Sequence, residues 1–281
     1  MAKTVRDRLE TALSIIADPK GEGARACLTV YADSARAAAD AADARAKQGT
    51  TLGPLDGTIV SIKDLFDIAG EPTRAGSKIL RDAPPAKADA AIVQRLRAAG
   101  AVIAAKTSMT EFAFSGVGFN PHYGTPGNPV DRARVPGGSS SGAGVAAADG
   151  MCDIAIGTDT GGSVRIPAAL CGIVGFKPSR QRVPTRGAFP LSFTLDSIGP
   201  LAKTVEQCFH ADAVMAGEAA GTLSPAPLKG LRFAVLENAS FTPHDATVSS
   251  AFAAGLDTLR KAGVVATPTP FPFLDAMLAV N

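Results

Sequence analysis

Two Gly-Gly-Ser turns are the part of the sequence best suited to chemistry. They end at Ser139 and Ser163, which lie 24 residues apart. Because glycine has no Cβ, consecutive glycines let backbone N–H groups and a serine hydroxyl approach one small group closely. A strand before Ser163 and a helix-like segment after it place this serine near a helix N-terminus, where free N–H groups favour negative charge. This pattern indicates a nucleophile beside an oxyanion hole, and the alternative is a glycine turn whose serine only caps the helix.

A serine nucleophile needs a base, because its own proton is held too tightly at neutral pH. None of the three histidines (His122, His210 and His244) is close in sequence to either turn. The other candidate is Lys63, which ends a β-branched strand predicted to be buried over residues 58–62. A lysine base must be neutral, so its pKa must fall from about 10.4 to about 7 or 8. Burial among apolar neighbours is expected to cause that fall.

The serine run also matches a second motif, the G-x-S-x-G nucleophile elbow of α/β-hydrolases, centred on Ser140. That motif requires a strand directly before it. Residues 131–136 form instead a polar stretch that ends in proline. We therefore set the α/β-hydrolase interpretation aside.

A longer pattern connects these residues. Lys63 follows a hydrophobic strand, Gly137 begins the run Gly-Gly-Ser-Ser-Ser-Gly, Gly157 begins Gly-Thr-Asp-Thr-Gly-Gly-Ser-Val-Arg-Ile-Pro-Ala-Ala, and Gly175 begins Gly-Phe-Lys-Pro. Together with the spacing of the two serines, this pattern resembles the amidase signature family of amide hydrolases over about residues 52–201. The signature is long and specific.

The resemblance implies a Ser–cisSer–Lys catalytic triad. Ser163 would be the nucleophile, and Ser139 would be the bridging serine, joined to Gly138 by a cis peptide bond. Lys63 would be the base that starts the proton relay. The oxyanion hole would consist of four backbone N–H groups, those of Thr160, Gly161, Gly162 and Ser163.

Four further residues are expected to support the site, namely Gly138, Ser140, Asp159 and Arg165. Arg165 is expected to pair with Asp159 and hold the nucleophile loop, although it could instead contact an acidic substrate. Ser140 is expected to hydrogen-bond within the site, and Asp196 to be a turn residue. The walls of the substrate pocket are expected to come from the loop at residues 115–131, from residues 186–195 and from a C-terminal region that this sequence does not include.

Helices and strands alternate along the chain, which predicts an α/β fold. Strands are predicted over residues 58–62, 101–105, 153–156, 231–236 and 264–267. Helices are predicted over residues 5–16, 24–48, 89–99, 204–216, 245–262 and 274–280. The family's fold, a mixed β-sheet core covered by helices on both sides, agrees with this alternation.

We expect a single amidase-signature domain over residues 1–281, with an N-terminal helical segment over 1–50 and a catalytic core over 51–201. Residues 221–227 are typical of a linker. The chain ends within the helix predicted over 274–280, whereas members of the family usually continue well beyond this point. We therefore expect the domain to be incomplete at its C-terminus, with apolar surface exposed near that end.

Composition restricts the class of protein. The hydrophobic fraction of 46% and the charged fraction of 19% are typical of a soluble globular protein. A net charge of +2, with scattered lysines and arginines, argues against direct contact with nucleic acid or a charged membrane. No apolar run is long enough to span a membrane, and residues 1–16 do not resemble a signal peptide. Four widely spaced cysteines predict reduced thiols, no disulfides and no zinc site, hence a cytoplasmic protein.

The sequence therefore predicts an amidase that hydrolyses a small carboxamide to a carboxylate plus ammonia or an amine, through an acyl-serine intermediate. No metal or organic cofactor is expected, and the expected partner is a small-molecule amide. Two alternatives stay open: the A subunit of a glutamyl-tRNA amidotransferase, which would feed ammonia from glutamine to partner subunits, and a truncated, inactive amidase that only binds a partner. A homodimer is also compatible with the sequence.

Overall fold

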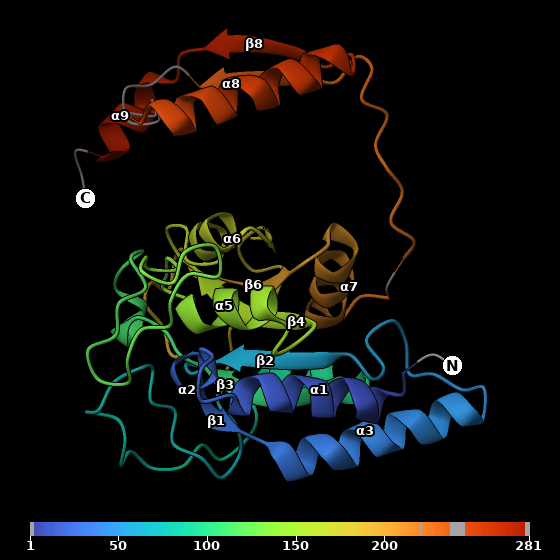
Figure 1. The fold of residues 1–281 in the computed structure, drawn as a ribbon. Coiled ribbons are helices and arrows are strands. Elements are labelled where there is room, and N and C mark those ends of the chain that lie inside the picture. Colours follow the sequence, from blue (N-terminus) through green and yellow to red (C-terminus); the bar gives the residue numbers. More distant parts are fainter. Residues whose placement is uncertain (1–2, 220, 237–244, 279–281) are drawn as a thin grey trace. The chain divides into compact units, whose positions relative to one another are not determined.

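The computed structural model describes residues 3–219, 221–236 and 245–278 (Figure 1). The chain divides into two compact units, residues 1–222 and 223–281, and each unit has its own sheet. The boundary falls within the predicted linker at residues 221–227. A single domain over residues 1–281 stays a prediction.

The first unit is built on a six-stranded mixed sheet with the order β1-β3-β2-β4-β6-β5. Strand β2 is parallel to both of its neighbours, β3 and β4, whereas β1, β5 and β6 pair in antiparallel fashion. The strands are β1 (Cys27–Val30), β2 (Ile59–Lys63), β3 (Val102–Thr107), β4 (Ile154–Asp159), β5 (Val174–Gly175) and β6 (Ser197–Ala202). The carboxyl ends of β2, β3 and β4 therefore meet at one edge of the sheet.

Helices cover both faces of this sheet, as expected for the fold. They are α1 (Val5–Ala17), α2 (Gly23–Ala26), α3 (Ala32–Lys47), α4 (Ala91–Ala98), α5 (Ser141–Asp149), α6 (Arg165–Cys171) and α7 (Val205–Ala216), with a short 3₁₀ helix at Glu111–Ala113. Alternate strand residues belong to two separate apolar clusters: Ile59 packs with α1, α3 and α5, and Val60 packs with α4 and α7. This alternation is what a sheet buried on both sides requires.

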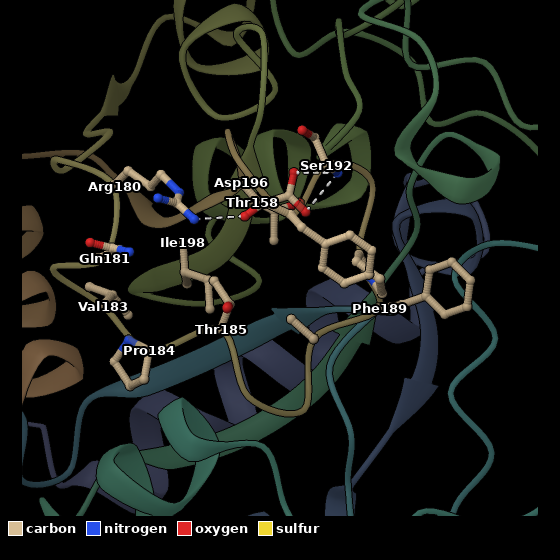
Figure 2. Close-up of a pocket in the computed structure, with 13 residues that line it drawn as sticks. Thr158, Arg180, Gln181, Val183, Pro184, Thr185, Phe189, Ser192, Asp196 and Ile198 are labelled. Carbon is tan, nitrogen blue, oxygen red and sulfur yellow. Dashed lines mark hydrogen bonds between the residues drawn. The ribbon is translucent and has the colours of Figure 1, made fainter.

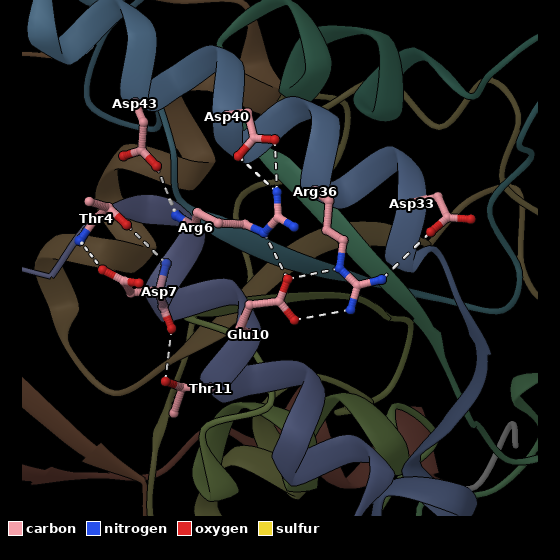
Figure 3. A network of polar contacts seen from close by, with 9 residues as sticks. All are labelled: Thr4, Arg6, Asp7, Glu10, Thr11, Asp33, Arg36, Asp40 and Asp43. Carbon is pink, nitrogen blue, oxygen red and sulfur yellow. Dashed lines mark hydrogen bonds and ion pairs between the residues drawn. The ribbon is translucent and has the colours of Figure 1, made fainter.

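The N-terminal helices are fastened by a polar network between α1 and α3, which lie side by side (Figures 1 and 3). Asp43 of α3 accepts hydrogen bonds from the backbone N–H groups of Val5 and Arg6, at 2.8 and 3.0 Å, and so caps the start of α1. The Arg36 guanidinium binds both carboxylate oxygens of Glu10 at 2.8 and 3.0 Å. Hydrogen bonds from Arg36 and Arg6 hold the pKa of Glu10 down at about 2.

Several elements differ from the sequence-based expectation. The helix predicted over residues 24–48 is wrong in its first part, because β1 separates α2 from α3. Residues of β1 pair with β3, and this non-local pairing overrides the helical preference of the alanine-rich segment. Strand β6 and helix α5 were not predicted, since Gly199 and Pro200 weaken the strand signal and serine and glycine weaken the helix signal.

The second unit contains strands β7 (Arg232–Leu236) and β8 (Val265–Thr269), which pair in parallel, and helices α8 (Ala246–Lys261) and α9 (Pro272–Leu278). Asp245 caps α8 by accepting a hydrogen bond from the Thr247 N–H at 2.8 Å. No side chain of α8 is buried. Exposed apolar side chains on this unit include Phe233, Val248, Phe252, Val265 and Phe273. The expectation of exposed apolar surface towards the C-terminal end of the whole chain stays a prediction.

Within the ranges that the structure describes, no helix combines the length and the apolar character needed to cross a membrane. All four cysteines are buried free thiols.

Candidate active site

Lys63 is the last residue of the central strand β2 and is fully buried. Its Nζ donates hydrogen bonds to the Ser139 Oγ at 2.7 Å and to the Thr158 Oγ1 at 2.9 Å. Thr158 lies near the carboxyl end of β4, which is parallel to β2. The parallel pairing thus brings a lysine and a threonine hydroxyl together at the same edge of the sheet.

Burial lowers the pKa of Lys63 to about 7, and the charges of Asp159 and Asp196 only partly oppose this effect. Both of its hydrogen-bond partners are neutral hydroxyl groups. A lysine in these surroundings is close to half neutral at physiological pH, which is the state that a general base needs.

Ser139 lies two residues before α5 and is fully buried, and the peptide bond that joins it to Gly138 is cis, as the resemblance implies. The backbone around it is tightly held: the Ser139 carbonyl accepts from the Thr110 N–H at 3.0 Å, and the Gly138 N–H donates to the Gly116 carbonyl at 2.8 Å. A Cβ on Gly138 would lie 2.7 Å from the Cα of Gly118. Only glycine at position 138 allows the two chain segments to approach this closely.

Ser163 lies two residues before α6 and is 7% exposed. The turns that carry Ser139 and Ser163 are joined through the backbone, because the Ser140 N–H donates to the Ser163 carbonyl at 3.2 Å. No hydrogen bond joins the Ser139 and Ser163 hydroxyls in the described part of the chain. The structure therefore brings the two turns together and contains the hydrogen bond between Lys63 and Ser139. The Ser163 hydroxyl makes no hydrogen bond to either of these two side chains in the described part of the chain.

Asp159 organises the nucleophile loop. Its carboxylate binds the Arg165 guanidinium through two contacts of 2.9 Å, which confirms the predicted pair. Burial alone would raise the pKa of Asp159, but the hydrogen bonds from Arg165 and from the Val164 N–H hold it below its usual value. The carboxylate also accepts from the Gly162 N–H at 2.8 Å. The expected oxyanion-hole role of Gly162 is thus corrected, since this N–H group already has a partner within the loop.

The other three N–H groups expected in the oxyanion hole, those of Thr160, Gly161 and Ser163, donate to no group among the described residues. Asp196 lies beside this loop and accepts a hydrogen bond of 2.5 Å from the Thr160 hydroxyl. It also accepts from the Leu191 N–H at 2.9 Å and from the Ser192 N–H, so it shapes a turn, as predicted. The Ser140 Oγ donates to the Thr158 carbonyl at 3.3 Å, which agrees with the bond expected within the site.

Thr158 is the site residue that sequence reasoning missed. Its hydroxyl is the second partner of Lys63, yet it lies five residues before Ser163, on the strand and outside the glycine turn. The signal that could have found it is a hydroxyl residue near the carboxyl end of a strand parallel to the lysine strand. That signal appears only once the neighbouring strands are known.

A cavity of about 330 Å³ adjoins the site (Figure 2). Thr158 and Ile198 line its inner side, and its other walls come from residues 180–181, 183–185 and 188–190 together with Ser192, Phe193 and Asp196. This agrees in part with the expected pocket walls, since five residues of the range 186–195 contribute, namely Ala188, Phe189, Pro190, Ser192 and Phe193. The loop at 115–131 lines a different hollow, formed by Ser115, Phe119 and Pro121 with residues 110–114.

A second buried lysine lies on the adjacent strand. Lys106 of β3 is 1% exposed, and its Nζ makes no hydrogen bond to any described residue. The nearest carboxylate oxygen is Glu71 Oε2, at 3.6 Å. Buried Asp64 is close enough for the Lys106 charge to act on it: burial raises the pKa of Asp64 to about 6, and Lys106 opposes that rise.

Comparisons with known proteins agree with this architecture. The family model Amidase matches residues 17–281. AtzE, a 1-carboxybiuret hydrolase subunit of Pseudomonas sp. (strain ADP), is 48% identical over 204 residues, which are 72% of this chain and 44% of that protein. The 2-amino-5-chloromuconic acid deaminase of Comamonas testosteroni is 43% identical over 85% of this chain and 52% of that protein. The A subunit of the glutamyl-tRNA(Gln) amidotransferase of Anaeromyxobacter dehalogenans (strain 2CP-C) is 42% identical over 88% of this chain and 53% of that protein.

Among solved structures, native peptide amidase from Stenotrophomonas maltophilia superposes with a TM-score of 0.83 at 32% identity, over 95% of this chain and 59% of that chain. The chain spans about half the length of the curated relatives it matches. The family match covers both the β2 lysine and the two serine turns, so the chain belongs to the amidase signature family.

Proposed function

We propose that this chain carries the catalytic centre of an amidase that hydrolyses a small carboxamide to a carboxylate plus ammonia or an amine. One observation carries the proposal: a fully buried lysine whose pKa falls to about 7 donates a 2.7 Å hydrogen bond to Ser139. A relay from Ser163 through Ser139 to Lys63 would then explain why the base lies so far in sequence from both turns. The relatives named as a deaminase, a peptide amidase and a hydrolase subunit support the reaction class.

The proposed reaction has two halves. Neutral Lys63 takes the proton of Ser139 while Ser139 takes that of Ser163, and the Ser163 Oγ attacks the amide carbonyl carbon. The N–H groups of Thr160, Gly161 and Ser163 stabilise the negative charge on the carbonyl oxygen. The C–N bond then breaks, and the relay returns the proton to the departing nitrogen. Water attacks the acyl-serine along the same path and releases the carboxylate, and no metal or organic cofactor takes part.

The test is release of ammonia from a panel of primary amides by the wild-type chain and by Ser163→Ala. We expect the substitution to abolish release. Ser141→Ala is the matched control, because Ser141 is a buried serine of the same run whose hydroxyl has no partner in the described part of the chain. This control should keep most of the activity. Ammonia release that survives in Ser163→Ala would remove Ser163 as the nucleophile.

A second candidate function is that of a glutamyl-tRNA amidotransferase A subunit. The specific support is the set of relatives with that name, at 39 to 43% identity over 88 to 90% of this chain. Hydrolysis of glutamine that appears only when partner subunits are added would favour this role. A folded chain that hydrolyses no amide, with or without such partners, would favour the third candidate, an inactive amidase that binds a partner.

The cellular compartment and the oligomeric state belong to the same proposal. Four buried free thiols support a reducing compartment, and we propose the cytoplasm. A homodimer and a complex with amidotransferase subunits are both compatible with it, and chromatography with light scattering on the purified chain distinguishes a dimer from a monomer.

A further inference from the structure

We propose that Arg180 selects substrates that carry a carboxylate, so that the preferred amide is anionic. This inference rests on the proposed amidase function and names the class of substrate that the same site accepts. The relevant cavity has a volume of about 330 Å³, and Thr158, which lines it, also accepts a hydrogen bond from Lys63. That volume is at the lower end of the range of roughly 300 to 1,000 Å³ typical of small-molecule sites.

The two charged side chains that line this cavity differ in how free they are to bind a substrate. Arg180 and Asp196 are the two charged residues among those that line it. The Asp196 carboxylate is occupied, because it accepts from the Thr160 hydroxyl and from the Leu191 and Ser192 N–H groups. Asp196 therefore holds the wall of the cavity in place, and its carboxylate has little capacity left to accept hydrogen bonds from a substrate.

Arg180 has donors to spare. Its Nη2 donates to the Phe193 carbonyl at 2.8 Å, and it forms no ion pair within the described part of the chain. A guanidinium has five N–H donors arranged as a planar fork, which matches both oxygens of a carboxylate. Figure 2 shows this guanidinium pointing towards the side of the cavity that Thr158 and Asp196 line.

The backbone beside Arg180 is also unusual. Gln181, which lines the same cavity, has a φ of +71°, a left-handed conformation that residues with a Cβ rarely adopt. Such residues cost free energy and tend to occur where a site dictates the chain path. The conformation at Gln181 thus supports a segment shaped for binding, in addition to the free donors of Arg180.

Together these observations define a substrate with two ends. The amide group would lie at the Thr158 side, near Lys63 and Ser163, and a carboxylate would lie at the Arg180 side. Succinamate fits this description, and butyramide is its neutral counterpart of the same chain length. The pair isolates the contribution of the carboxylate.

The experiment measures turnover and binding separately. For turnover, kcat/KM is measured with succinamate and with butyramide, for the wild-type chain and for Arg180→Gln. We expect wild type to favour succinamate, and the ratio of the two kcat/KM values to fall by about 10- to 100-fold in Arg180→Gln, as for the loss of a charge-assisted contact. Arg186→Gln is the matched control: its guanidinium contacts Gln94 outside the cavity, at 3.2 Å, and this variant should keep the wild-type ratio.

For binding, calorimetry with succinamate and butyramide is carried out on Ser163→Ala and on Ser163→Ala/Arg180→Gln. Succinamate should bind the single variant more tightly than butyramide, and this advantage should disappear in the double variant. Equal binding of the two compounds to Ser163→Ala would overturn the inference, even if both amides are hydrolysed. Binding that depends on Arg180 without any turnover would contradict the proposed function and leave the inference standing.

Discussion

Two lysines near the carboxyl ends of adjacent parallel strands are almost completely buried, and their surroundings differ. Lys63 of β2 contacts two neutral hydroxyls, those of Ser139 and Thr158. Lys106 of β3 lies 3.6 Å from the Glu71 carboxylate, beside buried Asp64. A buried ammonium needs compensating charge, and the Glu71 and Asp64 carboxyl groups are placed to supply it to Lys106. Among the described residues, no carboxylate is in direct contact with Lys63, and its pKa falls to about 7.

The comparison teaches that burial of a lysine does not by itself indicate catalysis. Hydroxyl neighbours let the amine lose its proton and accept another from a serine, whereas carboxylate neighbours hold the proton in place. The contrast is therefore between a base and a structural cation. The same change, lysine to methionine, made at each position, tests it directly.

The largest expected effect is on activity in Lys63→Met. Removal of a general base should lower kcat/KM by about 10²- to 10⁴-fold. Ammonia release from the best amide of the panel measures this loss. A variant that keeps full activity near neutral pH would show that another group is the base.

The free energy of unfolding should depend on pH differently in wild type and in Lys63→Met. Because the folded-state pKa of Lys63 lies below its unfolded value, the unfolded wild-type chain binds more protons between about pH 7 and 10. Wild-type stability therefore receives a contribution that rises with pH across this window. Urea unfolding at several pH values should show that rise in wild type and its absence in Lys63→Met.

The next largest effect is on stability in Lys106→Met. Without Lys106, the carboxylate of Asp64 stays buried with less compensation, and we expect a loss of roughly 2 to 4 kcal/mol at about pH 8. The pKa of Asp64 is already raised to about 6, so this group favours the folded state at low pH and that contribution is lost as the pH rises through about 6. The destabilisation of the variant relative to wild type should therefore shrink at about pH 5.

Activity in Lys106→Met should stay within about threefold of wild type at a temperature where the variant is folded, because surface and structural charges away from the reacting atoms contribute little to the barrier. If Lys106→Met lost activity as Lys63→Met does while remaining folded, the distinction between base and structural cation would be wrong.

The smallest effect is expected in Thr158→Val, which keeps the shape of the side chain and removes one of the two hydroxyl partners of Lys63. Loss of a single hydrogen bond should lower kcat/KM by about 3- to 10-fold. The lost acceptor stabilised the charged form of Lys63, so the midpoint of the pH–rate profile should shift to lower pH. A fall in activity without any shift of the midpoint would indicate that Thr158 acts on the fold and not on Lys63.

The residues of the site were easier to predict from the sequence than the contacts between them. Lys63, Ser139 and Ser163 were predictable because the chemistry depends on local patterns, a buried strand with a terminal lysine and two glycine turns. The contact of Thr158 with Lys63 was not, since it depends on the pairing of β2 with β4, which are far apart in the chain.

The same limit applies to the fold. Strands β2, β3 and β4 have strong local signals, whereas β1 and β6 are strands because of the strands with which they pair. Alanine-rich segments flank β1, and β6 contains Gly199 and Pro200, so neither strand has a strong signal of its own. The use of the Gly162 N–H by Asp159 is likewise a matter of loop geometry that spacing does not encode.

The most direct test of the relay is the rate at which a fluorophosphonate modifies the chain as a function of pH, followed by intact-mass spectrometry and peptide mapping. This reagent labels an activated serine and needs no knowledge of the substrate. We predict a single adduct on Ser163, with a rate that rises with pH through a midpoint near 7, the pKa of Lys63, and that collapses in Lys63→Met. An adduct on another residue, or a rate on Ser163 that is unchanged in Lys63→Met, would contradict the account.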